Sequence, residues 1–239
     1  ILFSDSINVG FEDFVSNNQH YSLSFLLGNI HVNSNDTIFY FYDFNYSKNE
    51  QLSLFIPQFS IKNIKWKKLW QEKMIDIESI LVQSPELYMI GKEAKNKNPN
   101  SSKSLNEMIS KIGKGLKIKN IKVRNGNFSY QNNHKTRAVQ KALIERVNLN
   151  LKNIIILSSS PTLIKPHNLL EKIISLGGKN IELELKNNTT LSIQKLALSS
   201  NLKDFLLSEF TFKKDSTLSA YSKSLKIKNI DWNKYWKSK

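Results

Sequence analysis

The 239-residue sequence contains no cysteine, only eight glycines and five prolines, and three arginines. Without cysteine the chain has no disulfide, no cysteine-ligated zinc and no thiol nucleophile. No segment approaches the roughly 18 consecutive apolar residues that indicate a transmembrane helix. The glycines form no phosphate-binding loop, and neither a GxSxG nor an HExxH motif is present. These absences exclude the best-known sequence signatures of hydrolases, nucleotide-binding enzymes and metalloproteases.

The charge of the chain is strongly one-sided. Lys+Arg number 35 and Asp+Glu number 20, which gives a formal net charge of +15. Because 32 of the basic residues are lysine and 28 residues are asparagine, part of this excess fits the coding bias of an AT-rich genome. The functional interpretation is attraction to an anionic partner, such as lipid headgroups or nucleic acid. Nucleic-acid binders use arginine for bidentate contacts, so we do not expect nucleic acid as a partner.

Side chains that could carry chemistry are scattered. The four histidines stand singly in polar stretches, without a carboxylate at metal-ligand spacing: His20, His31, His134 and His167. Asp76 and Glu78 are two residues apart and would share one face of a strand. They could form a paired-carboxylate site, but this spacing is more typical of the polar outer face of an amphipathic strand. The sequence therefore predicts no enzyme activity, no metal and no cofactor.

Most of the chain alternates apolar and polar residues with a period of two. The alternation is clearest over 21–27, 147–151 and 181–185. It is typical of half-buried antiparallel strands. Only two short helices are predicted, over 104–113 and 168–176. Pro85 marks a turn between strands at 75–82 and 87–90.

A hairpin is predicted in the middle of the chain. Asn125-Gly126 separates two alternating runs, and this dipeptide is the strongest short-range hairpin signal. We therefore expect a strand over 116–123, a tight turn, and a strand over 127–131.

The chain contains an internal repeat. Residues 61–70 read IKNIKWKKLW and residues 227–236 read IKNIDWNKYW, so seven of ten positions are identical, including both tryptophans, at an offset of 166. A third, shorter copy lies at 116–123. We interpret the chain as about one and a half units of a tandem β architecture, and as a piece of a longer protein. Lysines interleaved with tryptophans can bind single-stranded nucleic acid, but their recurrence favours a structural layer.

The repeat divides the chain into four segments. They are a first β unit over 1–91, an exposed loop over 92–104, a middle β segment with the hairpin over 105–172, and a truncated second copy of the 1–70 unit over 173–239.

The repeated motif contains one residue too many for strict alternation. The excess lies between Ile61 and Ile64, between Ile118 and Ile121, and again at 227–230. A β-bulge at the Lys-Asn dipeptide would return the apolar residues to one face, and asparagine tolerates the unusual backbone angles that this needs.

The run IKNIKWKKLWQEKMIDIESILVQSPELYMIG resembles a recurring unit of AsmA-like proteins, the bacterial envelope family that includes the TamB and YhdP types. LKIKNIKVRNGNFSYQ resembles a hairpin of that family, VNLNLKNIII resembles the strand that follows it, and the composition is similar to that of Bacteroidota members. The resemblance implies an elongated, twisted antiparallel β-sheet, bent into a trough (a β-taco) and built from tandem repeats, with one apolar concave face.

The resemblance also implies a function. The chain would be a non-enzymatic periplasmic segment of a Gram-negative cell envelope. It would bind or conduct phospholipid acyl chains between the inner and outer membranes, in outer-membrane biogenesis. Strand parity, corrected for the bulge, predicts the lining of the groove: Ile61, Ile64, Trp66, Ile75, Ile77, Leu87, Met89, Ile118, Ile121, Val123, Phe128 and Tyr130.

Two alternatives remain open from the sequence. The same trough could be a structural scaffold subunit of an envelope secretion, motility or outer-membrane assembly machine, with protein partners in place of lipid. The sheet could also fold over on itself into a closed sandwich with a solid core, because two short helices cannot cover so many strands.

Overall fold

A computed structural model describes residues 8–18, 23–33, 38–49, 51–91, 113–132, 139–157, 172–200, 203–215 and 217–230. These ranges hold β1 (Asn8–Asn18), β2 (Leu23–Asn33), β3 (Ile38–Lys48), β4 (Leu52–Ile64), α1 (Trp66–Glu72), β5 (Met74–Gln83), β6 (Glu86–Gly91), β7 (Gly115–Asn132), β8 (Val139–Leu157), β9 (Ile173–Leu185), β10 (Thr189–Ser199), β11 (Asp204–Lys214) and β12 (Leu218–Ile227).

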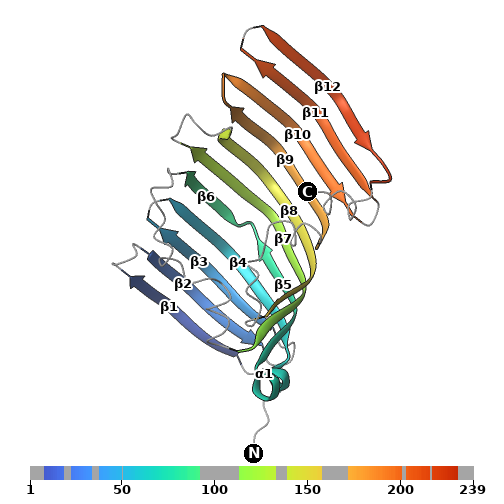
Figure 1. Cartoon of the computed structure of the whole chain (residues 1–239). Coiled ribbons are helices and arrows are strands. Elements are labelled where there is room, and N and C mark those ends of the chain that lie inside the picture. The colour runs from blue at the N-terminus through green and yellow to red at the C-terminus, as the bar shows by residue number, and fades with distance from the viewer. Residues whose placement is uncertain are drawn as a thin grey trace, which may run out of the picture.

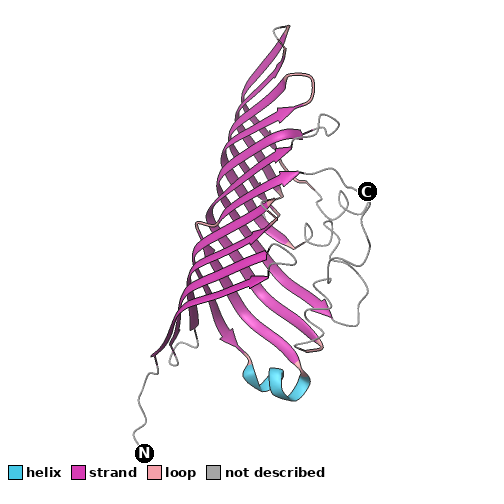
Figure 2. Ribbon diagram, turned by 90° about the vertical axis from the view of Figure 1, so that its left-hand side faces the viewer, coloured by secondary structure: helices cyan, strands magenta, loops and turns pink. Residues whose placement is uncertain are grey.

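All twelve strands belong to one sheet, in the order β1-β2-β3-β4-β5-β7-β8-β9-β10-β11-β12, with β6 paired to β4 and β7. Figure 1 shows the strands side by side in one row that runs from β1 to β12. Figure 2 shows that this row is strongly twisted and that α1 lies at one end of the strands. The predicted fold class, a mainly β, twisted and trough-like sheet, is confirmed.

The sheet is mixed, so the prediction of purely antiparallel pairing is wrong at one place. β7 runs parallel to β5 and β6, with Ile77 opposite Ile118 and Leu87 opposite Phe128. β5 and β6 lie end to end between β4 and β7, and Pro85 stands at the break. A parallel pair needs a connection of about a dozen residues or more, and the chain between β6 and β7 is long enough to provide it.

Asn125-Gly126 does not form the predicted hairpin, because β7 continues through it. A type I′ turn needs positive φ at both central residues, and only Asn125 has it, with φ 53°. The pairing with β8 is displaced by one residue at Gly126 and is back in its earlier register at Phe128, so the dipeptide lies at a local irregularity of the two strands. Gly126 serves a close approach instead, since a Cβ there would lie 3.0 Å from Cγ of Pro85.

The helix predicted over 168–176 is also wrong where the structure describes it. Residues from Ile173 onward begin β9, which pairs with both β8 and β10, while 168–171 lie outside the described residues. The helix predicted over 104–113 falls outside them too, apart from Gly113. The described helix, α1, follows β4 directly. It ends at Lys73, which has φ 56° and whose N–H donates to the carbonyl of Lys68.

The extra residue predicted in the repeated motif is present. Ile64 pairs with Ile77 and Ile61 pairs with Ile80, and between them Asn63 adopts φ 54°. The pairing register between β4 and β5 is the same before and after Asn63, so β5 contains one extra residue at the same level as β4. A β-bulge adds a residue to one strand only, so this feature is a step shared by neighbouring strands.

The step continues across two more strands. Ile118 pairs with Ile154 and Ile121 pairs with Leu151, and Asn153 again has a positive φ, of 53°. We call this feature the aligned step, defined by the four residues that stand at the same level in β4, β5, β7 and β8: Asn63, Glu78, Lys119 and Asn153.

Strand positions recur along the chain. β2, β3 and β4 begin 166 residues before β10, β11 and β12, which is the offset of the two tryptophan motifs. The left-handed residues Asp43 and Asn63 recur at the same offset, at Glu209 and Asn229. A repeated unit requires such spacing, and the division of the chain into units stays a prediction.

Replacing Asn153 tests the backbone of the aligned step. Asn153 is exposed, so its substitution leaves no cavity. Asn153→Val should lower the free energy of unfolding by about 1–2 kcal/mol, because a β-branched residue resists the left-handed conformation, whereas Asn153→Gly should be neutral or stabilising. Chemical denaturation of both variants measures this, and equal stability of the valine variant and the unsubstituted protein would contradict the assignment.

Candidate functional site

One face of the sheet is apolar from β3 to β12. Cross-strand pairs on this face join apolar residues to apolar residues, as in Phe41–Phe59, Ile80–Ile121, Leu149–Leu176 and Leu196–Leu207. Four isoleucines, each between 5% and 7% exposed, form its central cluster: Ile77, Ile118, Ile154 and Ile156. We call this surface the apolar face.

Six of the residues predicted to line a groove lie together in or against the central cluster: Ile61, Ile64, Ile75, Ile77, Ile118 and Ile121. Five more share the apolar face by strand register. Leu87 lies opposite Phe128, Met89 opposite Tyr130, and Val123 opposite Val82 and Leu149: these pairs extend the cluster along β6, β7 and β8. The aligned step returns Ile121 and Val123 to the face of Ile118. A second extra residue, the left-handed Asn125, does the same for Phe128 and Tyr130.

Trp66 is the exception, and its predicted place in the sheet is wrong. It begins α1 instead of continuing β4, and its side chain is 44% exposed. Its ring meets the ring of Phe39 edge-on, with centroids 5.8 Å apart. Trp66 therefore contacts the apolar face from the end of the sheet. Trp232, in the second copy of the motif, lies outside the described residues.

The apolar face also extends beyond the predicted residues. In β9 to β11 a second cluster has Ile181, Ile193 and Leu207 at its centre. In β3 and β4 the face is aromatic, with Phe41 stacked on Phe59 at 4.4 Å and Phe44 edge-on to Phe59. The sequence contains a signal for this extension of the apolar face. Ile193 and Leu196 are three residues apart, as are Leu207 and Phe210, which is the spacing found in the tryptophan motif.

The apolar face is not a solid core. None of the large side chains in the described ranges is less than 2% exposed, and most apolar side chains on this face are only half-buried. The substantial contacts between described elements join neighbours in the sheet, together with α1 and β5. A closed sandwich would bury such side chains fully against a second layer, so a trough describes this part of the chain better.

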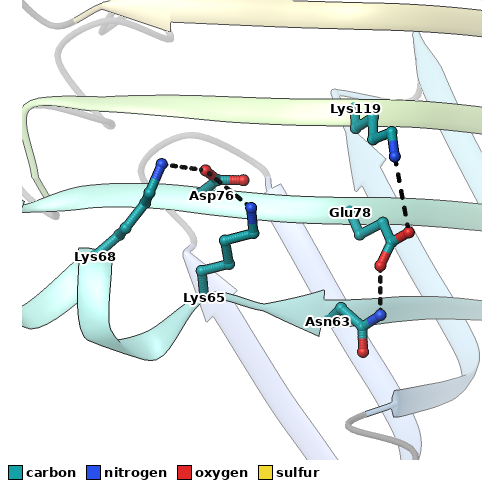
Figure 3. A network of polar contacts seen from close by, with 6 residues as sticks. All are labelled: Asn63, Lys65, Lys68, Asp76, Glu78 and Lys119. Atoms are coloured by element: carbon teal, nitrogen blue, oxygen red, sulfur yellow. Dashed lines mark hydrogen bonds and ion pairs between the residues drawn. The ribbon is translucent and has the colours of Figure 1, made fainter.

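The opposite face is polar and basic, and the two carboxylates considered as a paired site, Asp76 and Glu78, both have partners on it. Asp76 is 4% exposed, and its Oδ2 lies 2.9 Å from Nζ of Lys68 and 3.9 Å from Nζ of Lys65. Glu78 accepts a hydrogen bond from Nδ2 of Asn63 and lies 4.0 Å from Nζ of Lys119 (Figure 3). Each carboxylate thus ties neighbouring segments together, which fits the polar outer face of a strand.

These contacts shift two pKa values. The hydrogen bond from Asn63, assisted by the charge of Lys119, lowers the pKa of Glu78, although desolvation opposes the shift. The hydrogen bond to Asp76, together with its charge, raises the pKa of Lys68. Both shifts favour the charged forms, so the contacts at the aligned step and under α1 are strongest at neutral pH.

The described ranges hold neither a candidate metal site nor a helix that could cross a membrane. They contain no cluster of three side chains suited to hold a metal ion, and no helix among them has the length and apolarity to cross a membrane. No protein-family model matches the chain, and no curated protein is significantly similar to it. The function must therefore be argued from the apolar face and its surroundings.

The titration of Glu78 tests the aligned step in solution. Because its pKa is lowered in the folded state, its contribution to stability is present above the ordinary glutamate pKa and is lost as pH falls through the lowered value. Asn63→Gly keeps the backbone conformation but removes the hydrogen bond, so the pKa of Glu78 should rise toward its ordinary value. NMR of the side-chain carboxyl carbon of Glu78 measures its titration in the unsubstituted protein and in the Asn63→Gly variant. An unchanged pKa in the glycine variant would show that the hydrogen bond is absent in solution.

Proposed function

We propose that this chain is a non-enzymatic, groove-forming segment of an AsmA-like envelope protein that binds phospholipid acyl chains on its apolar face. The supporting observation is the continuity of that face over ten strands, from β3 to β12, without a covering layer among the described elements. Contiguous exposed apolar surface of more than a few hundred Å² marks an interaction site in soluble proteins.

The chemistry of the face suits an acyl chain. Its side chains are mostly isoleucine, leucine and phenylalanine, which exclude water and offer no hydrogen bonds. An alkyl chain needs no directional partner, since its transfer from water is driven by the area removed from solvent. A substrate with polar groups along its length would leave those groups unpaired on this surface.

The envelope setting follows from the resemblance of the repeated tryptophan motif to AsmA-like proteins. In that setting the trough would lie in the periplasm of a Gram-negative bacterium. It would carry lipid between the inner and outer membranes, in outer-membrane biogenesis.

A structural scaffold is the second candidate, and β12 favours it. Among the strands that the structure describes, β12 pairs with β11 alone, and four of its apolar side chains are 45–65% exposed: Leu218, Tyr221, Leu225 and Ile227. A sheet edge with exposed apolar residues can accept a strand from a partner protein. If the chain is a scaffold, a protein partner should copurify with it from envelope extracts in a stoichiometric amount.

Charge substitutions on the two faces test lipid binding. Ile77→Asp places a carboxylate in the central cluster, and Val123→Asp places one at a half-buried position of the same face. Both should reduce the lipid that copurifies with the protein several-fold, because a charge strongly opposes contact with alkyl chains. Ile155→Asp is the matched control, since Ile155 lies between Ile154 and Ile156 in sequence but is 58% exposed on the opposite face.

Native mass spectrometry and lipid extraction measure the bound lipid, and circular dichroism checks that each variant keeps its strands. Val123→Asp keeps the test valid if Ile77→Asp fails to fold. The proposal is wrong if the unsubstituted protein carries no lipid and cannot be loaded with any, or if the control loses as much lipid as the two variants.

A further inference from the structure

Helix α1 presents two large aromatic rings to solvent. Residues three and four apart share a helix face, so Trp66, Leu69 and Trp70 point to one side. Trp66 is 44% exposed and Trp70 is 69% exposed. The helix joins β4 to β5 at the end of the strands, beyond the sheet itself (Figure 2).

This aromatic side of α1 is continuous with the apolar face. The ring of Trp66 contacts the ring of Phe39, and Phe39 is paired with Ile61 on the apolar face. Trp70 lies one helical turn beyond Trp66. The apolar surface of the trough therefore continues past the end of the sheet into solvent.

The surroundings of these rings are mainly basic, with four lysines over 65–73 and one exposed carboxylate on the helix, Glu72. Lys65 and Lys68 approach Asp76, whereas Lys67 and Lys73 are exposed at either end of the helix. Tryptophan with neighbouring lysine is the combination that proteins place at membrane–water interfaces. The indole ring sits at the level of the headgroups, and the lysine amine reaches the phosphates along its apolar stem.

We propose that α1 docks on the surface of an anionic phospholipid bilayer, with Trp66 and Trp70 among the headgroups and Lys67 and Lys73 at the phosphates. The inference rests on the proposed function, because docking here joins the bilayer to the apolar face, on which acyl chains would bind, at the ends of β4 and β5. The exposed lysines favour an anionic lipid surface over an apolar groove of a protein partner.

Flotation with vesicles tests the docking. The full chain is mixed with vesicles of phosphatidylcholine and phosphatidylglycerol, and in parallel with vesicles of phosphatidylcholine alone. We expect the protein to float with the mixed vesicles and to be released as salt is raised, since salt screens exposed charges. Trp70→Ser should weaken this binding roughly tenfold, as should Lys67→Gln combined with Lys73→Asn.

Each variant has a matched control. Tyr221→Ser removes an aromatic ring of similar exposure, 65%, from β12, which lies far from α1 in the order of strands. Lys152→Gln with Lys213→Gln removes the same charge from exposed positions on β8 and β11. Both controls should bind as the unsubstituted chain does.

Tryptophan fluorescence tests whether α1 is the part of the chain that contacts the bilayer. The chain has four tryptophans, so Trp232 and Trp236 are replaced by phenylalanine to leave only those of α1. Mixed vesicles should then shift the emission to the blue, and lipids with brominated acyl chains should quench it. Absence of both changes in a protein that floats would mean that another surface binds, and would overturn the inference.

The outcomes for the two proposals are separable. Trp70→Ser should weaken vesicle binding and still load a lipid supplied as a soluble short-chain form. A chain that loads this lipid but never binds vesicles disproves the docking and leaves the lipid-binding function intact. A chain that binds vesicles through α1 but loads no lipid disproves the lipid-binding function alone.

Discussion

The sheet depends on one constraint. Each long strand must keep its apolar side chains on one face, although the alternation of apolar and polar residues in its sequence shifts by one position along its length. With Ile61 on the apolar face, strict alternation would turn Ile64 to the opposite face. The left-handed Asn63 inserts one residue and restores the facing. Because the aligned step repeats this insertion at one level in four neighbouring strands, backbone pairing resumes in the same register on both sides. Around Gly126 the pairing with β8 is displaced by one residue and then returns to the same register, and each strand has a left-handed residue there, Asn125 and Arg146.

The residues inserted by this constraint are polar, and they bond to one another across the strands. Asn63 donates to Glu78, which also attracts Lys119, and in the other half of the sheet Asn180 Nδ2 donates to Glu145 Oε2 at 2.7 Å. An inserted residue cannot join the apolar face, so it adds to the opposite one. The apolar face and the polar contacts behind it are thus two results of a single irregularity in the sequence pattern.

Sequence spacing is enough to find the apolar face, because side-chain parity is a local property. Pairing is not local, and the wrong predictions have this in common. Asn125-Gly126 has the residues of a hairpin, but β5 and β6 pair with the residues on either side of it and β8 pairs with Gly126, so β7 continues through the dipeptide. The parallel pairing of β7 depends on the direction in which a long connection returns, which no neighbouring residue encodes. For α1, the helical spacing of Trp66, Leu69 and Trp70 is present in the sequence. It follows directly on the strand pattern of β4, so the change from a period of two to a helical period is difficult to recognise.

An apolar face of this extent also links stability to whatever covers it. Any molecule that binds the folded sheet and not the unfolded chain raises the free energy of unfolding with its concentration, so the sheet and its occupant cannot be considered apart. Aliphatic side chains such as Ile77 and Ile118 exclude water but do not distinguish one alkyl chain from another. Discrimination must therefore arise where polar and aromatic groups meet the apolar surface. In the described part of the chain the best-defined such place is the end of the sheet at α1, where Trp66 contacts the face and lysines surround it.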